Sequence, residues 1–128
     1  MSHEAFRQQV AEAAGIDPDA AEQAIQATLV TLGEKISEGE AEDLARHLPD
    51  EFAPLIVQRG NARSFSADEF FRRIAEREGT DPETAERHAR AVVAALALRV
   101  GHREFGEMLA QLSRELRERL TAPVAAPH

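Results

Sequence analysis

The sequence contains no cysteine, tryptophan or tyrosine, and its six aromatic side chains are all phenylalanine. Without cysteine, disulfides, thiolate metal sites and cysteine nucleophiles are excluded. No stretch approaches the roughly 20 apolar residues of a membrane-spanning helix, and residues 1–4 are too polar and acidic for a signal peptide. We therefore expect a cytoplasmic protein without membrane contacts, whose core consists mainly of Ala, Leu, Val and Ile.

Basic side chains are scarce, since 15 Lys and Arg stand against 23 Asp and Glu and leave a net charge of −8. A protein that binds nucleic-acid phosphates or anionic lipid over a wide area needs a basic surface, so this composition argues against both partners. Residues 1–64 hold 5 basic and 12 acidic side chains, whereas residues 65–128 hold 10 and 11. The contrast reflects either drift of solvated surface or two surfaces that contact different partners.

Two segments, residues 6–52 and 70–116, align without a gap at a constant offset of 64. Identical positions include Phe6 and Phe70, Gly15 and Gly79, Asp17 and Asp81, Pro18 and Pro82, Leu32 and Leu96, and Leu48 and Leu112. The pattern predicts a tandem duplication. Because two separate domains of about 60 residues would each bury little surface, we expect the repeats, about 2–58 and 65–121, to share one core in a single domain, 1–121. Residues 122–128 are expected to form a disordered tail.

Each repeat is predicted to begin with two helices. Ser2 and Ser66 are in position to cap the first helices, which end at Gly15 and Gly79. The second helices begin at Asp-Pro pairs and carry apolar residues at helical spacing: Ala21, Ile25, Leu29, Leu32 and Ile36 in one, and Ala85, Ala89, Val93, Leu96 and Val100 in the other. Additional alanines favour central helices that approach closely, although the high helix propensity of alanine is an alternative explanation.

The third helices are expected to differ between the repeats. In the first, Ser37 caps a helix that Pro49 ends, and a turn-rich segment, residues 50–57, follows before a connector at residues 58–63. In the second, Ser113 takes the place of Pro49, so we expect the last helix to continue unbroken to about Thr121, with Phe105, Leu109, Leu112 and Leu116 facing inward. The predicted fold is an all-α six-helix bundle, in which two tandem three-helix repeats pack as one pseudo-twofold domain.

Three stretches resemble the domain of unknown function 2267 family of small helical bacterial and archaeal proteins. They are residues 32–49 (LGEKISEGEAEDLARHLP), 65–79 (FSADEFFRRIAEREG) and 81–93 (DPETAERHARAVV). The resemblance covers about residues 4 to 120 and implies an all-helical fold of two such units. It implies no activity, because the family is defined without an assigned function.

One set of side chains has the spacing of metal ligands. Glu40, Asp43 and His47 would share one face of a helix and offer two carboxylates and an imidazole to a divalent ion. Three ligands from one helix seldom complete a coordination shell. We therefore favour a solvated acidic face with an Asp43–His47 pair near the end of the helix. The serines are few and several have capping roles, and no glycine-rich phosphate loop follows a strand, so we expect no catalytic residues, no cofactor and no enzymatic activity.

Arginine outnumbers lysine fourteen to one. A GC-rich genome would explain this excess without any function. The second repeat nevertheless concentrates guanidinium groups, which bind carboxylate or phosphate, on helices expected to adjoin: Arg72, Arg73, Arg77, Arg87 and Arg90. An acidic run on another copy of the protein is one candidate ligand, formed by Glu38, Glu40, Glu42, Asp43, Asp50 and Glu51.

These observations give a leading hypothesis and two alternatives. The leading one is a non-enzymatic protein–protein interaction or scaffold module with an unknown protein partner, which could also self-associate as a homodimer through the arginine-rich and acidic surfaces. One alternative is a nucleic-acid-binding protein that places the arginine cluster on phosphates. The other is small-ligand binding in a groove between the repeats.

Overall fold

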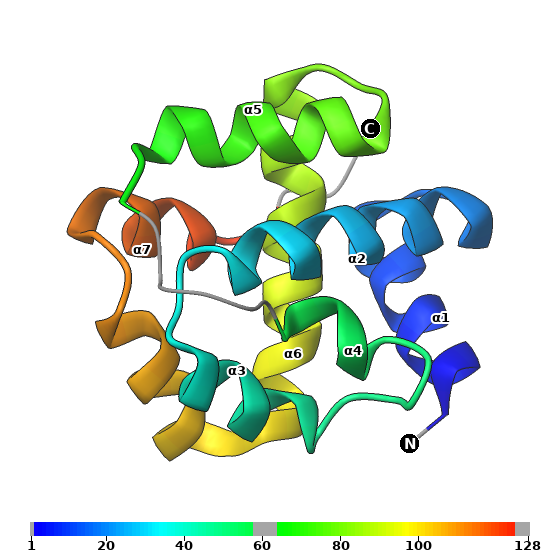
Figure 1. Cartoon of the computed structure of the whole chain (residues 1–128). Coiled ribbons are helices and arrows are strands. Elements are labelled where there is room, and N and C mark those ends of the chain that lie inside the picture. The colour runs from blue at the N-terminus through cyan, green and yellow to red at the C-terminus, as the bar shows by residue number, and fades with distance from the viewer. Residues whose placement is uncertain (1, 58–63, 125–128) are drawn as a thin grey trace.

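The computed structural model describes residues 2–57 and 64–124. Within these ranges it contains no strand and seven helices (Figure 1): α1 (His3–Ala14), α2 (Pro18–Gly33), α3 (Glu38–Ala45), α4 (Ala53–Ile56), α5 (Ala67–Glu78), α6 (Pro82–Ala110) and α7 (Arg114–Leu120). The predicted all-α class is confirmed, but the predicted number of six helices is wrong. The expected connector, residues 58–63, and the last four residues of the expected disordered tail lie outside the described residues.

Local capping fixes where the longer helices begin. The predicted N-caps are confirmed, since each side chain accepts a hydrogen bond of 2.8–3.1 Å from the amide three residues later, at Ser2, Asp17, Ser66 and Asp81. Gly15 and Gly79, with φ of 68° and 79°, end α1 and α5 in the left-handed conformation that glycine adopts without steric cost. The bounds of α1 and α5 thus differ by 64 residues at both ends.

The core contains side chains from both halves of the chain. Helices α2 and α6 cross at the centre of the molecule, and α1 and α5 each pack against both of them (Figure 1). All ten residues of the two predicted apolar stripes are buried, from Ala21 to Ile36 on the first and from Ala85 to Val100 on the second. None of the helices in the described ranges is long and apolar enough to cross a membrane.

Helix α6 bends sharply at Gly101, where φ is 80° and ψ is 167°. This backbone conformation is accessible almost only to glycine. Gly101 stands 64 residues after Ser37, which caps α3, so both halves interrupt the helical path at the same place by different means. The bend divides α6 into a first arm, residues 82–100, and a second arm, residues 102–110, which turns away at the lower end of the molecule (Figure 1).

The prediction of an unbroken last helix is wrong. Helix α6 ends at Ala110, and Ser113 adopts an extended conformation in which its hydroxyl accepts a hydrogen bond of 3.2 Å from the Leu116 amide. A serine in this conformation caps a new helix instead of continuing the old one. Of the residues expected to face inward, Phe105 and Leu109 are only partly buried, whereas Leu112 and Leu116 are buried.

The third helix of the first half is also shorter than expected. It ends at Ala45, before Leu48 and Pro49, although Leu48 is buried as predicted. The following segment, residues 50–57, was predicted to be rich in turns; it begins with turns and then forms the short helix α4 at residues 53–56. Pro54 lies in the first turn of this helix, where the missing amide of proline leaves no hydrogen bond unmade.

Aromatic and basic side chains join the end of α2 to the start of α5. Lys35, which is 8% exposed, donates a hydrogen bond of 2.6 Å from Nζ to the Phe65 carbonyl. The Phe65 ring lies 4.5 Å from Lys35 Nζ and 3.9 Å from the Arg73 guanidinium carbon. Such cation–π contacts strengthen when the cation is removed from water. Burial, and then the charge of Arg73, lower the pKa of Lys35.

Candidate functional site

The acidic residues that the sequence singled out lie on α3 and on the turn after it. Most of them are exposed or partly exposed, as at Glu38, Glu42, Asp43, Asp50 and Glu51. Glu40 is different, because it is 7% exposed, and one of its carboxylate oxygens has no hydrogen-bond partner within the described residues. It therefore belongs to the contact between α3 and α6 instead of an exposed acidic surface.

The predicted pair between Asp43 and His47 is wrong, because each of these residues contacts a different partner. Because α3 ends at Ala45, His47 lies beyond the helix, and its Nε2 approaches Glu104 Oε2 on the second arm of α6 at 3.4 Å. Asp43 pairs instead with Arg46 at 3.2 Å. In the parts of the chain that the structure describes, no group of three or more His, Asp or Glu side chains converges closely enough to hold a metal ion.

Carboxylates crowd the contact between α3 and α6. Burial raises the pKa of Glu40, and the nearby charges of Glu107, Asp43 and Glu104 raise it further. The folded state thus binds a proton at Glu40 more tightly than the unfolded chain does. This contribution to stability is fully present below pH 4.5, the pKa of an unperturbed glutamate, and is lost as the pH rises through the pKa of the folded state.

Replacing Glu40 with glutamine is expected to raise the free energy of unfolding by about 1 kcal/mol at pH 7 and above, because the amide carries no charge into the buried position. The gain should shrink toward zero as the pH falls below about 4.5, where Glu40 of the unmodified protein is also neutral. Urea unfolding followed by circular dichroism across pH 4 to 8 measures both effects. Glu42→Gln, on the exposed face of the same helix, is the control, and an equal gain there would contradict the argument.

Two arginines of the predicted cluster bind α2 across the interface with α5. Arg77 Nη1 and Nη2 donate to the two oxygens of Glu34 at 2.8 and 3.0 Å, and Arg77 Nη1 also donates to Thr31 Oγ1 at 2.7 Å. Arg73 Nη1 lies 3.5 Å from the same carboxylate. The hydrogen bonds and charge of Arg77, followed by those of Arg73, lower the pKa of Glu34. Both guanidinium groups therefore have carboxylate partners within the chain.

The remaining arginines of the cluster differ in their partners. Arg72 pairs with Glu69, and Arg90 pairs with Glu86 and donates to the Arg119 carbonyl at 2.8 Å. Arg119 in turn contacts the oxygens of Glu86, Asp68 and Glu115 at 2.6, 2.9 and 3.0 Å. Arg87 is exposed and donates only to the Thr84 hydroxyl, at 3.3 Å, among the described residues.

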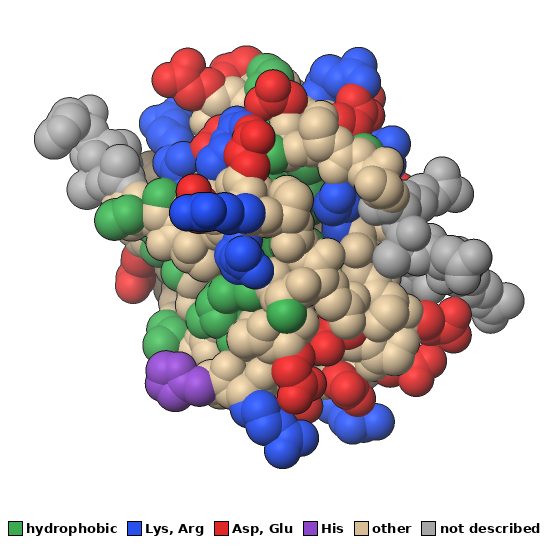
Figure 2. Space-filling view, turned by 90° about the vertical axis from the view of Figure 1, so that its left-hand side faces the viewer, with side chains coloured by type: hydrophobic (Ala, Val, Ile, Leu, Met, Phe, Trp, Pro, Cys, Tyr) green, Lys and Arg blue, Asp and Glu red, His purple; other side chains and the backbone are tan. Residues whose placement is uncertain are grey.

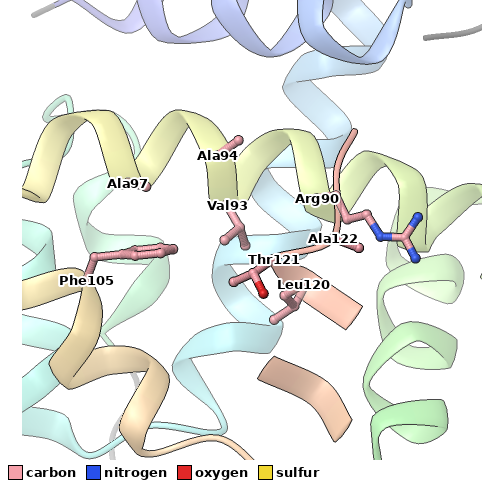
Figure 3. A pocket seen from close by; sticks show the side chains of 8 residues that line it. All are labelled: Arg90, Val93, Ala94, Ala97, Phe105, Leu120, Thr121 and Ala122. Carbon is pink, nitrogen blue, oxygen red and sulfur yellow. The ribbon is translucent and has the colours of Figure 1, made fainter. Parts of the chain in front are cut away.

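An apolar groove lies between the first arm of α6, Phe105 of the second arm and the end of α7; we call it the α6–α7 groove (Figure 3). One part encloses about 160 Å³ and is lined by Arg90, Val93, Ala94, Ala97, Phe105, Leu120, Thr121 and Ala122. The adjoining part encloses about 440 Å³ and is lined by Ala97, Leu98, Gly101, His102 and Phe105. Ala97 and Phe105 line both parts, so the two parts adjoin.

Leu98 is the most conspicuous residue of the groove. Its exposed fraction is 76%, and no other large hydrophobic side chain in the described ranges is comparably exposed. At the offset of 64, Leu98 corresponds to Glu34, the residue that Arg73 and Arg77 bind in the other half. The corresponding positions on α1 hold Gln9 and Ala13, neither of which is charged. The first half therefore has an ion-paired glutamate, Glu34, where the second half has an exposed leucine, Leu98.

The surroundings of the groove carry charges of both signs. Figure 2 shows hydrophobic side chains grouped beside Lys and Arg side chains, with Asp and Glu side chains above and below them, on the face of the molecule that carries α7. Arg90 and His102 line the groove itself.

A small pocket that contains residues of both halves lies elsewhere. It encloses about 190 Å³ and is lined by Gln23, Gln26, Ala27, Val30, Leu55 and Arg77. It is smaller than the roughly 300 Å³ at which small-molecule sites begin.

Sequence reasoning missed two features of the second half. One is the exposure of Leu98, which a comparison with Glu34 at the same place in the first half could have indicated. The other is a pair between His88 Nδ1 and Glu78 Oε1, both largely buried, at positions where the first half has Ala24 and Ala14. Buried polar pairs of this kind stabilise only when their hydrogen bonds are complete.

A family model described as "Uncharacterized conserved protein (DUF2267)" matches residues 3–119. A comparison with curated proteins found no match.

Proposed function

Because the chain belongs to this family of uncharacterized conserved proteins, evidence for its function must come from its own surface, and we propose a non-enzymatic module that binds another protein through the α6–α7 groove. The observation that carries the proposal is Leu98, which is 76% exposed beside the apolar hollow. A single exposed leucine is ordinary on a protein surface. Here it adjoins Ala94, Ala97 and Phe105, so that an exposed leucine and an apolar hollow lie together on one surface.

The ion pairs that the arginines make within the chain favour the α6–α7 groove, and not the charged surfaces, as the binding site. Arg73, Arg77 and Arg90 already bind carboxylates of the same chain. Contact with phosphates or with the acidic run of a second copy would have to compete with these pairs. The net charge of −8 adds repulsion toward nucleic acid. Both a nucleic-acid function and self-association by charge are therefore weaker proposals.

We further propose that the two halves are tandem repeats related by a pseudo-twofold axis. The shared offset of 64 in the bounds of α1 and α5 supports this, as does the packing of α1 on α6 in the way that α5 packs on α2. On this proposal the α6–α7 groove is a specialisation of the second repeat, at the position of the Glu34 ion pairs in the first. An experimental structure in which residues 2–57 and 66–121 fail to superimpose would contradict it.

Replacing Leu98 with glutamate is the test of the proposed function. Because the side chain is already exposed, we expect the free energy of unfolding to change by less than about 0.5 kcal/mol. A charge placed beside the hollow should nevertheless abolish association, since it leaves the apolar hollow unfilled and brings a desolvated carboxylate into the interface. The measurement is affinity capture from native lysate with the immobilised full chain, together with sedimentation of the free protein.

Arg46→Glu is the matched control, because Arg46 is exposed at the end of α3 and lines neither part of the groove. The unmodified protein and this variant should retain the same partner, and Leu98→Glu should lose it. If all three proteins capture the same set, or none forms a complex, the groove is not the interaction site.

A further inference from the structure

We propose that the partner segment in the α6–α7 groove is an acidic amphipathic helix. This inference rests on the proposed function, because it requires the groove to be the binding surface. It adds the conformation and the charge of the segment that binds there. Two independent sets of observations support it, the form of the groove and the distribution of cations that lack carboxylate partners.

The form of the groove favours a helix. Its walls are the two arms of α6 and, at one end, Leu120 of α7 and the two residues after it. Its floor is apolar, and an amphipathic helix docks in a groove between helices through residues one and two turns apart. An extended segment binds instead by adding a strand to the edge of a sheet. The described residues form no sheet and therefore offer no such edge.

The first cation without a carboxylate partner lies on the wall formed by α6. Arg87 precedes Ala94 by seven residues and Leu98 by eleven, so all three lie along one face of the helix. The distance along the axis from Arg87 to Leu98 is about 16 Å at 1.5 Å per residue, or three turns. In the described part of the chain, Arg87 makes no ion pair.

The second such cation, Arg117, lies on α7, one turn before the residues that line the groove. Arg117 of α7 comes four residues before Thr121, which lines the groove, and the Thr121 hydroxyl donates to the Arg117 carbonyl at 2.8 Å. Residues four apart lie on the same side of a helix. No ion pair of Arg117 occurs in the described ranges, although its neighbour Arg119 contacts three carboxylates.

The contrast between these arginines indicates the charge of the partner. The chain has 23 acidic side chains, and Arg73, Arg77, Arg90 and Arg119 all find one. Within the described ranges Arg87 and Arg117 do not, although each lies about one helical turn before a residue that lines the groove, Arg90 and Leu120. Among the described residues, Lys35 and Arg99 also lack a carboxylate partner, but Lys35 donates to the Phe65 carbonyl, Arg99 donates to Gln9 Oε1, and both lie over phenylalanine rings. Glutamates or aspartates on the two polar edges of a bound helix would pair with Arg87 and Arg117, while its apolar side chains fill the hollow next to Leu98. Complementary charges at the rim raise the association rate and select against basic partners.

A second copy of the chain fits less well. Its most acidic helix, α3, holds Ala41 and Leu44 fully buried, so α3 cannot present an apolar face without leaving its own core. The proposed occupant is therefore a helix of another protein.

The experiment uses three synthetic peptides of about 18 residues and the full chain. The first is an acidic amphipathic helix with leucines at positions i, i+3, i+4 and i+7 and glutamates on the other face. The second replaces each glutamate with lysine, and the third is a scramble of the first. Fluorescence anisotropy at about 50 mM salt should show binding of the acidic helix, at least about tenfold weaker binding of its basic twin, and none of the scramble.

Variants of the protein locate the binding. Reversal of the two arginines without carboxylate partners near the groove, in Arg87→Glu with Arg117→Glu, should weaken binding of the acidic helix about tenfold, and this difference should decrease as salt screens the charges. Leu98→Glu should abolish binding, and the matched reversal Arg46→Glu should leave it unchanged. Amide shifts in the NMR spectrum of the labelled chain should concentrate on residues 87–105 and 117–122.

The outcomes separate this inference from the proposed function. Equal binding of the acidic and basic helices, or no effect of the double reversal, overturns the acidic partner, while binding that Leu98→Glu abolishes keeps the groove as an interaction site. A dimer that Leu98→Glu dissociates, without peptide binding, makes a second copy the occupant and likewise overturns the inference. Absence of any association that depends on Leu98 contradicts both proposals.

Discussion

Replacing Leu96 with alanine is expected to lower the free energy of unfolding by about 3 to 4 kcal/mol. Leu96 has no exposed surface and lies on the first arm of α6, which crosses α2 at the centre of the core. Removal of the side chain takes away buried apolar contacts and leaves a cavity that the surrounding helices fill only in part. Urea unfolding monitored by circular dichroism gives the difference directly.

Leu98→Ala is the matched control, two residues away on the same helix. Because Leu98 is 76% exposed, its truncation should change the free energy of unfolding by less than about 0.5 kcal/mol. Comparison of Leu96→Ala with Leu98→Ala therefore distinguishes a residue that stabilises the core from the residue that we assign to binding. Similar losses for the two variants would mean that Leu98 contributes to the core and would weaken the proposed function.

Replacing Gly101 with alanine is expected to cost about 1 to 3 kcal/mol of the free energy of unfolding. No atom obstructs a Cβ at this position, so the cost comes from the backbone, which holds φ at 80°. The variant should also change the α6–α7 groove, because Gly101 and its neighbours His102 and Phe105 line it. Differential scanning calorimetry measures the stability, and a crystal structure shows whether the bend persists.

Gly106→Ala is the control for this substitution. Gly106 lies within the helical second arm of α6, and a Cβ there would also meet nothing within 4 Å. Alanine should leave the stability unchanged or raise it by up to about 1 kcal/mol, because it restricts the unfolded chain. If Gly101→Ala behaves in the same way, the bend at Gly101 is not needed for the fold.

The parts of the fold that the sequence predicts correctly depend on short-range interactions. Caps such as Asp17 and Asp81, and apolar residues at helical spacing, act within one or two turns and can be identified from the sequence alone. Ser113 shows the opposite case. A serine can continue a helix or cap one, and here the outcome is a new helix, α7, whose Leu116 and Leu120 are buried in the shared core. That packing brings together distant parts of the chain and leaves no local signal.

The candidate site was less predictable for the same reason. The sequence identified Arg73 and Arg77 as a basic cluster, but their partner Glu34 lies 39 and 43 residues away along the chain. Only the fold shows that these charges are paired. Leu98 was missed because a leucine on a helix is usually part of the core, and its exposure depends on which neighbouring helix covers it.

The burial of Lys35 has a practical consequence for studies of motion in this protein. It is the one lysine of the chain, and its amine is held against the Phe65 carbonyl. Acylating reagents attack uncharged, accessible amines. The contact between the end of α2 and the start of α5 therefore protects the Lys35 amine from them in the folded protein. The rate of acylation at Lys35, measured at that residue by mass spectrometry of its peptide, then reports how often the end of α2 separates from the start of α5.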